Sequence, residues 1–155
     1  MVTLTSHSPA DTMTIGRDWG KQVARGWVIG LSGDLGAGKT QLVKGLAAGL
    51  GINARVHSPT FSLVNVYQGG LIPLFHLDLY RLETHEQISS AGLEEYLSPD
   101  GVTVIEWAER WFGEFPGTGE LHRVSELRDA GLHRWALLES AGENERRILY
   151  EDFGA

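Results

Sequence analysis

Cysteine is absent from this chain of 155 residues, which excludes disulfide bonds and thiolate metal sites. No uninterrupted apolar run approaches the roughly 20 residues that a membrane-spanning helix needs. The N-terminal stretch MVTLTSHSPADT lacks the basic and then apolar order of a secretory signal. We therefore expect a soluble cytoplasmic protein that makes no contact with a membrane.

Positive charge is scarce as well. Twenty acidic residues against 13 basic ones give a formal net charge of −7, and lysine occurs only at positions 21, 39 and 44. A surface with this charge repels nucleic acid, so we expect no binding to DNA, and none to RNA unless a partner supplies the positive surface. At 42% hydrophobic residues the chain can bury one core, and no repeat or linker-like stretch divides it. Residues 1–155 therefore predict a single domain.

The N-terminal half predicts a strand, a glycine loop and a helix in that order. Residues 27–32 form a short apolar run typical of a buried strand, and residues 42–50 carry apolar side chains at helical spacing. Between them lies GDLGAGKT, residues 33–40. Ahead of this unit, residues 2–5 alternate as a short strand, and a Ser-Pro pair then begins a helix that we expect to run to about residue 24.

The rest of the chain alternates between strand and helix patterns. The predicted elements are a hairpin of residues 61–68 and 71–80 around Gly69-Gly70 with positive φ at both glycines, a helix over residues 84–97, a buried strand over residues 102–105, a second hairpin of residues 121–128 and 132–140, and a short helix from residue 143. Together they predict an α/β fold of the P-loop NTPase type. Its sheet is expected to be parallel at the centre and flanked by antiparallel strands and hairpins, with helices on both faces.

The octapeptide GDLGAGKT matches the phosphate-loop pattern G-x-x-x-x-G-K-[ST], with the required strand before it and helix after it. Glycines allow backbone N–H groups to approach phosphate oxygens, and the helix that begins near Lys39 adds its dipole. Lys39 is expected to place its ammonium between the outer phosphates, and Thr40 to offer its hydroxyl to Mg²⁺. The alternative is a glycine-rich turn that binds nothing.

Two acidic residues end apolar runs, Asp78 in LFHLDLY and Glu106 in VTVIEW. A phosphate loop needs an acid that holds Mg²⁺ or orients water, and both residues are candidates for this catalytic role. The alternation of the first run places His76 and Tyr80 on the same strand face as Asp78. For that face the alternative is an ordinary solvent-facing strand surface, and for Glu106 it is a salt-bridged strand end.

Two further features stay open from the residues alone. Ser58-Pro59-Thr60 lies where other P-loop enzymes carry a mobile segment that senses the γ-phosphate through a hydroxyl, but Ser-Pro-Thr is also ordinary turn chemistry. Trp107 either belongs to the core or covers a nucleotide or a partner.

Five stretches stand in a fixed order along the chain: GDLGAGKTQLVKGL, HSPTFSLVNVY, LFHLDLYRL, AGLEEYL and VTVIEW. Together they resemble the TsaE (YjeE) family of small bacterial P-loop ATPases. The resemblance runs from the capped N-terminal helix to about Trp107 and continues more thinly to RWALLESAGE, with a loose match over residues 108–125. It implies an accessory Mg²⁺-dependent ATPase that binds ATP and ADP and is weak alone. Such a protein acts with TsaB- and TsaD-like proteins in making N6-threonylcarbamoyladenosine at position 37 of tRNA, and meets the tRNA only through the complex.

The resemblance also implies roles for residues of this chain. It assigns the phosphate cradle to residues 35–40, and Mg²⁺ to Thr40 with Glu106. It gives Asp78 a role in hydrolysis, makes residues 58–60 a switch-like loop and puts adenine near residues 9–12. The nucleotide-contacting residues expected from motif and resemblance together are Gly33, Leu35, Gly36, Ala37, Gly38, Lys39 and Thr40. A departure from the family is Gln41, where a second threonine is frequent.

Three other nucleotide-binding functions are alternatives to this one. A regulatory GTPase is unsupported, because no asparagine is followed by lysine as a guanine-specificity motif requires. A small-molecule kinase with a P-loop is the main alternative, since its core is equally compact and acidic. Such a kinase usually closes an arginine-bearing helical lid over the transferred phosphate, whereas residues 121–140 predict a β-hairpin with dispersed arginines. A module that holds nucleotide only as a structural ligand is the third possibility.

Overall fold

The computed structural model describes residues 1–34, 36, 38–59, 61–116 and 121–154, with only the backbone of residues 121 and 122. Within these residues seven strands join in one sheet, in the order β1-β7-β6-β2-β5-β4-β3. The strands are β1 (Val2–Ser6), β2 (Val28–Ser32), β3 (Val64–Tyr67), β4 (Leu74–Asp78), β5 (Val102–Glu106), β6 (Arg134–Ser140) and β7 (Arg146–Asp152). Strands β6, β2, β5 and β4 run parallel, whereas β3, β7 and β1 pair antiparallel with their neighbours. The predicted sheet, parallel at its centre with antiparallel flanks, is confirmed.

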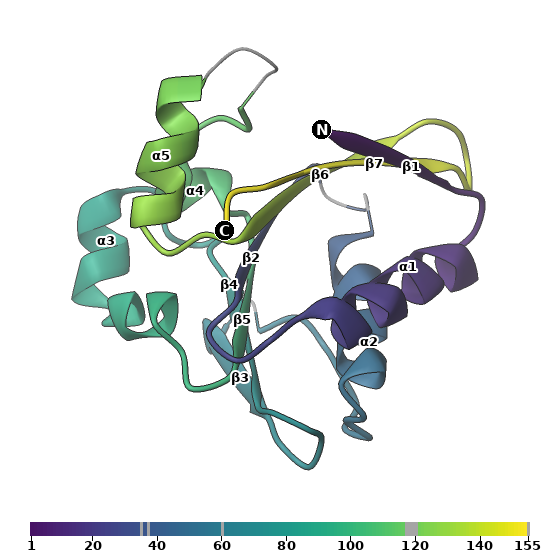
Figure 1. Ribbon diagram of the computed structural model, residues 1–155, viewed down its shortest axis with the longest axis horizontal. Coiled ribbons are helices and arrows are strands. Elements are labelled where there is room, and N and C mark those ends of the chain that lie inside the picture. The colour runs from purple at the N-terminus through teal and green to yellow at the C-terminus, as the bar shows by residue number, and fades with distance from the viewer. Residues whose placement is uncertain (35, 37, 60, 117–120, 155) are drawn as a thin grey trace.

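Helices cover both faces of this sheet, as predicted (Figure 1). One face carries α1 (Pro9–Gln22) and α2 (Lys39–Gly49), and the other carries α3 (His85–Ser90), the 3₁₀ helix η1 (Leu93–Leu97), α4 (Glu109–Phe112) and α5 (Leu121–Asp129). Two apolar clusters result, one under each helical layer. Strands β2 and β5 are buried at every position, because parallel strands between two helical layers meet solvent on neither face. None of the helices in the described ranges is long and apolar enough to cross a membrane.

Helices α1 and α2 approach each other closely along four glycines. A Cβ built on Gly45 of α2 would lie 2.1 Å from the carbonyl oxygen of Met13, and one on Gly16 of α1 would lie 2.2 Å from that of Leu42. Gly20 and Gly49 meet at the same interface with similar clearances. No side chain fits at these positions. Glycine therefore permits a direct backbone contact that holds α2, the helix after the glycine loop, against α1.

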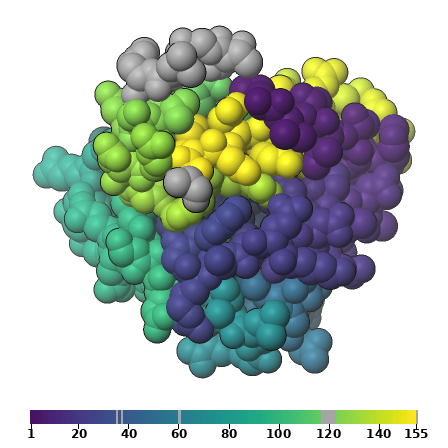
Figure 2. All heavy atoms as spheres, viewed as in Figure 1, coloured from purple at the N-terminus to yellow at the C-terminus, as the bar shows by residue number. Residues whose placement is uncertain are grey.

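The two ends of the chain meet at one side of the sheet. The first strand, β1, pairs antiparallel with the last, β7, and Ser6 lies opposite Arg146. Figure 2 shows the N-terminal residues in purple beside the C-terminal residues in yellow. Just after β1, the Ser8 side chain caps α1 by accepting a hydrogen bond of 3.0 Å from the N–H of Asp11. The beginning of α1 is therefore fixed next to the last hairpin.

The second half of the chain corrects two predictions about its end. Residues 121–129 form helix α5 rather than the first strand of a hairpin, because Val124 and Leu127 lie one helical turn apart and both pack into the cluster under this layer. Strand β6 pairs instead with β2 and β7. The helix expected from residue 143 is also wrong. Residues 141–145 form the β6–β7 turn, closed by the N–H of Ala141 donating to the carbonyl of Glu145 at 2.9 Å.

Two smaller predictions are corrected in the middle of the chain. The helix expected over residues 84–97 ends at Ser90, because Gly92 has a left-handed backbone (φ 73°) and the chain continues as η1. Only Gly69 of the glycine pair has positive φ, at 98°. The β3–β4 connection is longer than a two-residue turn because it packs on the end of α2, where the N–H of Leu71 donates to the carbonyl of Leu50 at 2.9 Å.

Candidate functional site

The carboxyl ends of three neighbouring parallel strands meet at one edge of the sheet. Strand β2 leads into the glycine loop, β4 ends at Asp78 and β5 ends at Glu106. Asp78 lies opposite Glu106 in the register of β4 with β5, and Glu106 lies opposite Leu31 of β2. A cavity of about 470 Å³ opens at this edge. Its described lining is Gly36, Gly38, Lys39, Thr40, Gln41, Ser58, Asp78, Tyr80, Glu106 and Trp107.

The glycine loop uses conformations that other residues rarely adopt. Gly33, Gly36 and Gly38 have φ of 138°, 80° and 100°. Gly38 is the N-cap of α2 and lines the cavity, and no side chain caps the first N–H groups of this helix. This arrangement suits an anion at the helix N-terminus. Leu35 and Ala37, two of the predicted contact residues, lie outside the described residues, and Gly33 contributes a carbonyl to Lys39 rather than a wall of the cavity.

Lys39 is folded back into this loop. Its Nζ donates to the carbonyls of Gly33 at 2.5 Å and Asp34 at 2.9 Å, and it lies 4.3 Å from the ring centroid of Trp107. Burial lowers the pKa of the Lys39 ammonium below its ordinary value, against the attraction of the nearby carboxylates of Glu106, Glu109, Asp78 and Asp34. The structure thus places a partly desolvated cation where the phosphate-loop pattern requires one.

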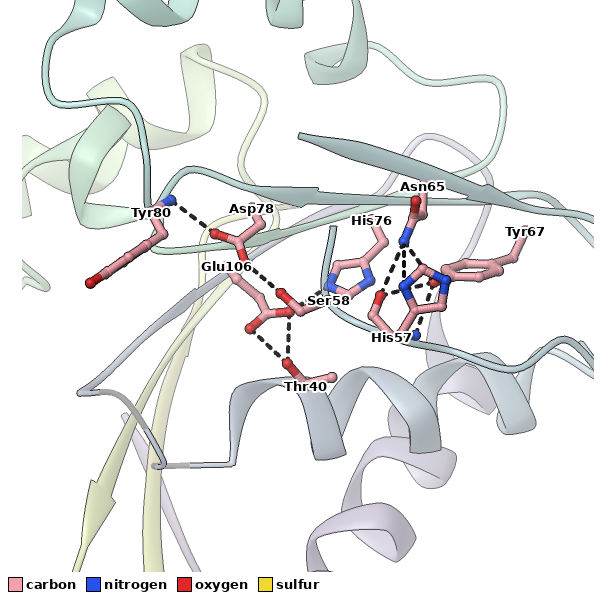
Figure 3. A network of polar contacts seen from close by, with 9 residues as sticks. All are labelled: Thr40, His57, Ser58, Asn65, Tyr67, His76, Asp78, Tyr80 and Glu106. Atoms are coloured by element: carbon pink, nitrogen blue, oxygen red, sulfur yellow. Dashed lines mark hydrogen bonds and ion pairs between the residues drawn. The ribbon is translucent and has the colours of Figure 1, made fainter. Parts of the chain in front are cut away.

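Glu106 joins three elements of the site. Its carboxylate oxygens accept hydrogen bonds of 3.1 and 3.2 Å from the Thr40 hydroxyl at the start of α2. Its Oε2 also lies 2.5 Å from Nε2 of His76 on β4 (Figure 3). Glu106 is 3% exposed and His76 is fully buried. His76 therefore lies on the same strand face as Asp78, as predicted, and both are buried rather than solvent-facing. Tyr80, predicted on the same face, lies beyond the end of β4 and is 42% exposed.

The Thr40 and Glu106 oxygens fit a small hard cation. Mg²⁺ takes oxygen ligands at about 2.1 Å, so neighbouring ligands of an octahedron lie about 3 Å apart. The separations of 3.1 and 3.2 Å between the Thr40 hydroxyl and the carboxylate oxygens match that spacing. The described residues contain no cluster of three or more His, Asp or Glu that could hold a metal by themselves. A Mg²⁺ ion here would depend on phosphate oxygens and water for its remaining ligands.

Asp78 holds the segment that carries Ser58. Its Oδ2 accepts a hydrogen bond of 2.6 Å from the Ser58 hydroxyl, and its Oδ1 accepts one of 2.9 Å from the N–H of Tyr80. Asp78 is 2% exposed. The predicted switch-like segment therefore begins in contact with the candidate catalytic acid, while its last residue, Thr60, lies outside the described residues.

The residue before Ser58 is clamped by two side chains of β3 that the sequence interpretation missed. The Tyr67 hydroxyl lies 3.1 Å from the carbonyl oxygen of His57 and 3.2 Å from its nitrogen, and Asn65 Nδ2 donates to the same carbonyl at 3.1 Å (Figure 3). The signal was present in VNVY, because residues two apart on a strand share a face.

Trp107 is a wall of the cavity as well as a packing residue. It has a positive φ of 62°, which is rare for a large side chain, and its ring lies 5.0 Å from that of Tyr80. It lines the cavity and packs against the cluster on the α3 side of the sheet. The structure thus shows the packing role, and it places the ring at the cavity wall, where covering a nucleotide stays a prediction.

A second cavity of about 220 Å³ adjoins the loop on the side of α1. Its described lining is Ser8, Pro9, Thr12, Gly36, Gly38, Gln41, Asn144 and Arg146. It shares the loop glycines with the first cavity and includes residues of the stretch 9–12, where the resemblance puts adenine. Asn144 and Arg146 were missed because the sequence predicted a helix where the structure has a turn and a strand.

Comparisons with known proteins agree on one family. A family model described as threonylcarbamoyl adenosine biosynthesis protein TsaE matches residues 6–131. The tRNA threonylcarbamoyladenosine biosynthesis protein TsaE of Bacillus subtilis is 36% identical over 148 residues, which cover 95% of this chain and 83% of that protein. The TsaE protein of Synechocystis is 51% identical over 100 residues, and the alignment spans 59% of this chain and only 63% of that relative's length. The crystal structure of Bacillus subtilis YdiB superposes with a TM-score of 0.72 at 31% identity, covering 99% of this chain and 86% of that one.

Proposed function

The chain belongs to the TsaE family of threonylcarbamoyl adenosine biosynthesis proteins, and from this premise we propose that it is a Mg²⁺-dependent ATPase that serves tRNA N6-threonylcarbamoyladenosine formation. The observation that carries the proposal is the meeting of Lys39, Thr40 and Glu106 around one cavity at the end of the glycine loop. A site for a nucleoside triphosphate with Mg²⁺ requires a lysine ammonium, a helix N-terminus and a pair of oxygen ligands.

Each part of the site has a role in this proposal. Thr40 and Glu106 would hold Mg²⁺, which would neutralise charge on the phosphate oxygens. Lys39 exchanges its contacts with loop carbonyls for phosphate oxygens. Asp78 orients the water that attacks the γ-phosphate and takes up its proton, so that ATP and water become ADP and phosphate. The second cavity, beside residues 9–12, receives adenine.

The segment from residue 57 links the nucleotide to the proposed partners. With the Ser58 hydroxyl bonded to Asp78, the candidate catalytic acid is engaged by the segment itself. Bound ATP draws this segment toward the γ-phosphate, which breaks the hydrogen bond from Ser58 to Asp78 and changes the surface that TsaB- and TsaD-like proteins contact. Hydrolysis resets it. In the assembled complex, we expect hydrogen exchange over residues 57–60 to differ between the nucleotide-free, ADP and non-hydrolysable ATP states; identical exchange in all three would contradict this role.

The net charge of −7 supports an accessory role for this chain, in which it does not itself bind the tRNA. A surface of this charge gives tRNA little electrostatic attraction, so the tRNA is bound and modified by the TsaD-like partner while this chain supplies ATP turnover.

Helix α5 restores a structural argument for the kinase alternative, because it is an arginine-bearing helix where the sequence predicted a hairpin. It does not act as a lid in this structure. Arg123 donates to the carbonyls of Phe112 at 2.5 Å and Glu114 at 2.7 Å, and no described residue that lines the cavity comes from α5. The contacts of this helix therefore do not favour phosphoryl transfer to a small molecule.

Phosphate release separates the candidate functions. Mg-ATP is incubated with the chain alone, with small-molecule acceptors, and with purified TsaB- and TsaD-like proteins. We expect slow release that rises when both partners are present and is lost in Lys39→Ala. Lys44→Ala, an exposed change on the same helix, is the control. A phosphorylated small product would instead identify a kinase, and bound ATP that is never hydrolysed would identify a structural ligand.

A further inference from the structure

Arg146 connects the last strand to the glycine loop. It is the first residue of β7 and lies opposite Ser6 of β1 and Ser140 of β6, so strands on both sides fix its backbone. It also lies beyond residues 6–131, the span of the family match. Its partly buried side chain reaches the second cavity, which Gly36 and Gly38 also line.

The guanidinium of Arg146 is bonded to backbone carbonyls. Nη2 donates to Gly36 of the loop at 3.1 Å, and Nη1 donates to Gly142 at 3.2 Å and Glu145 at 3.0 Å in the β6–β7 turn. Within the described ranges no carboxylate lies at ion-pair distance from it. Arg146 therefore places a guanidinium without a described ion-pair partner beside the loop and bonds one loop carbonyl.

Gly36 is the residue for which such a contact matters. Glycine leaves a φ of 80° readily because it has no Cβ to restrict it, and among the described residues beyond its chain neighbours nothing lies within 4 Å of a Cβ built there. None of these residues packs against the position of that Cβ, whereas the Arg146 hydrogen bond ties Gly36 to strand β7. Restricting a loop before its ligand arrives lowers the entropy lost on binding and raises affinity.

We propose that Arg146 is a positioning residue of the phosphate loop, which makes the C-terminal strand part of the nucleotide site. The proposal rests on the proposed function, since it takes the loop to bind the phosphates of ATP. Because Arg146 acts on the loop, it contributes to the binding of any polyphosphate, with or without adenine attached.

Calorimetric titrations with Mg-ATP, Mg-ADP and Mg-tripolyphosphate test this role in Arg146→Ala and Arg146→Gln. The matched control is Arg147→Ala, an exposed neighbour on the same strand. We expect both Arg146 variants to bind all three ligands roughly tenfold more weakly, which corresponds to about 1.4 kcal/mol, and the control to stay within about twofold of wild type. In the nucleotide-free protein, amide hydrogens of residues 33–38 should exchange faster in the Arg146 variants, with β6 and β7 unchanged, which general loss of stability would not produce.

The titrations distinguish failure of the positioning role of Arg146 from failure of the proposed function. Wild-type affinity for all three ligands in Arg146→Gln overturns the positioning role and leaves the proposed function standing. Weaker binding of ATP and ADP with unchanged tripolyphosphate binding also overturns it, because Arg146 would then contact the nucleoside. Absence of binding in the wild-type protein would instead remove the proposed function.

Discussion

At the scale of single residues, Glu106 is a buried carboxylate without a permanently cationic partner among the described residues. It is 3% exposed, and its partners there are a hydroxyl and an imidazole, with no lysine or arginine side chain at ion-pair distance. An isolated buried carboxylate is costly, so this position favours a residue whose charge is neutralised when a cation binds.

We expect Glu106→Gln to fold and to lose hydrolysis. The amide keeps the shape of the side chain but removes the charge that Mg²⁺ requires, so partner-stimulated phosphate release should fall roughly 100-fold or more. Glu139→Gln, an exposed change on β6, should leave the rate unchanged. The assay is phosphate release with a thermal unfolding scan on the same samples. Retention of the wild-type rate in folded Glu106→Gln would contradict the metal role.

His76→Leu tests whether the buried imidazole is a partner of Glu106 or only fills space. Leucine keeps most of the volume but removes the contact of 2.5 Å, which leaves Oε2 only the Thr40 hydroxyl that it shares with Oε1. We expect a loss of about 2 kcal/mol in the free energy of unfolding, measured by urea denaturation, because a buried carboxylate that loses a hydrogen-bond partner bears more of its desolvation cost. A loss below about 0.5 kcal/mol would mean that only the volume of His76 matters.

At the scale of elements, a close backbone contact between α1 and α2 fixes the helix that begins at the site. The glycines between α1 and α2 reduce helix propensity, and local reasoning would count them as defects. Their place in the structure explains them, because α2 carries Lys39 and Thr40 at its first turn and its backbone rests directly on α1.

Gly45→Ala should destabilise the protein although alanine is the better helix former. The new Cβ would lie 2.1 Å from the Met13 carbonyl oxygen, so the helices must separate. We expect a net loss of about 2 kcal/mol in unfolding free energy, against about 1 kcal/mol for the exposed reference change Ala48→Gly on the same helix. Stabilisation of the protein by Gly45→Ala would show that the helices have room to move.

Tyr67→Phe tests the hydrogen bonds that the Tyr67 hydroxyl makes to His57, the residue before Ser58. It removes one hydroxyl that bonds both backbone groups of His57 and leaves the buried ring in place. We expect a stability loss of about 1 kcal/mol and faster hydrogen exchange over residues 57–59 in the nucleotide-free protein. Unchanged exchange in this segment would show that Asn65 and Asp78 hold it without Tyr67.

At the scale of the whole molecule, the sequence predicted the parts of the site that come from short local patterns. The glycine loop with its flanking strand and helix is a contiguous motif, and Asp78 and Glu106 each end an apolar run. Strands that run parallel bring such ends together at one edge of the sheet, so the meeting of these residues follows once the central strands are parallel.

The C-terminal part of the site was not predictable in this way. Whether residues 121–129 are helix or strand depends on the cluster that buries Leu127, and whether residues 146–152 form a strand depends on pairing with both β1 and β6. Strand β6 adjoins β7 through a hairpin turn, but β1 lies at the other end of the chain and local spacing carries no information about it. Arg146 and the second cavity were missed for this reason.

Titration of Mg-ATP into the folded chain by calorimetry tests the central claim most directly, that Lys39, Thr40 and Glu106 with the glycine loop form a nucleotide site. We predict saturable binding by the wild-type protein, a loss of roughly 100-fold in affinity in Lys39→Ala, and wild-type affinity in Lys44→Ala. Equal affinity in Lys39→Ala and wild type, or no heat of binding from the folded wild-type protein, would contradict the account.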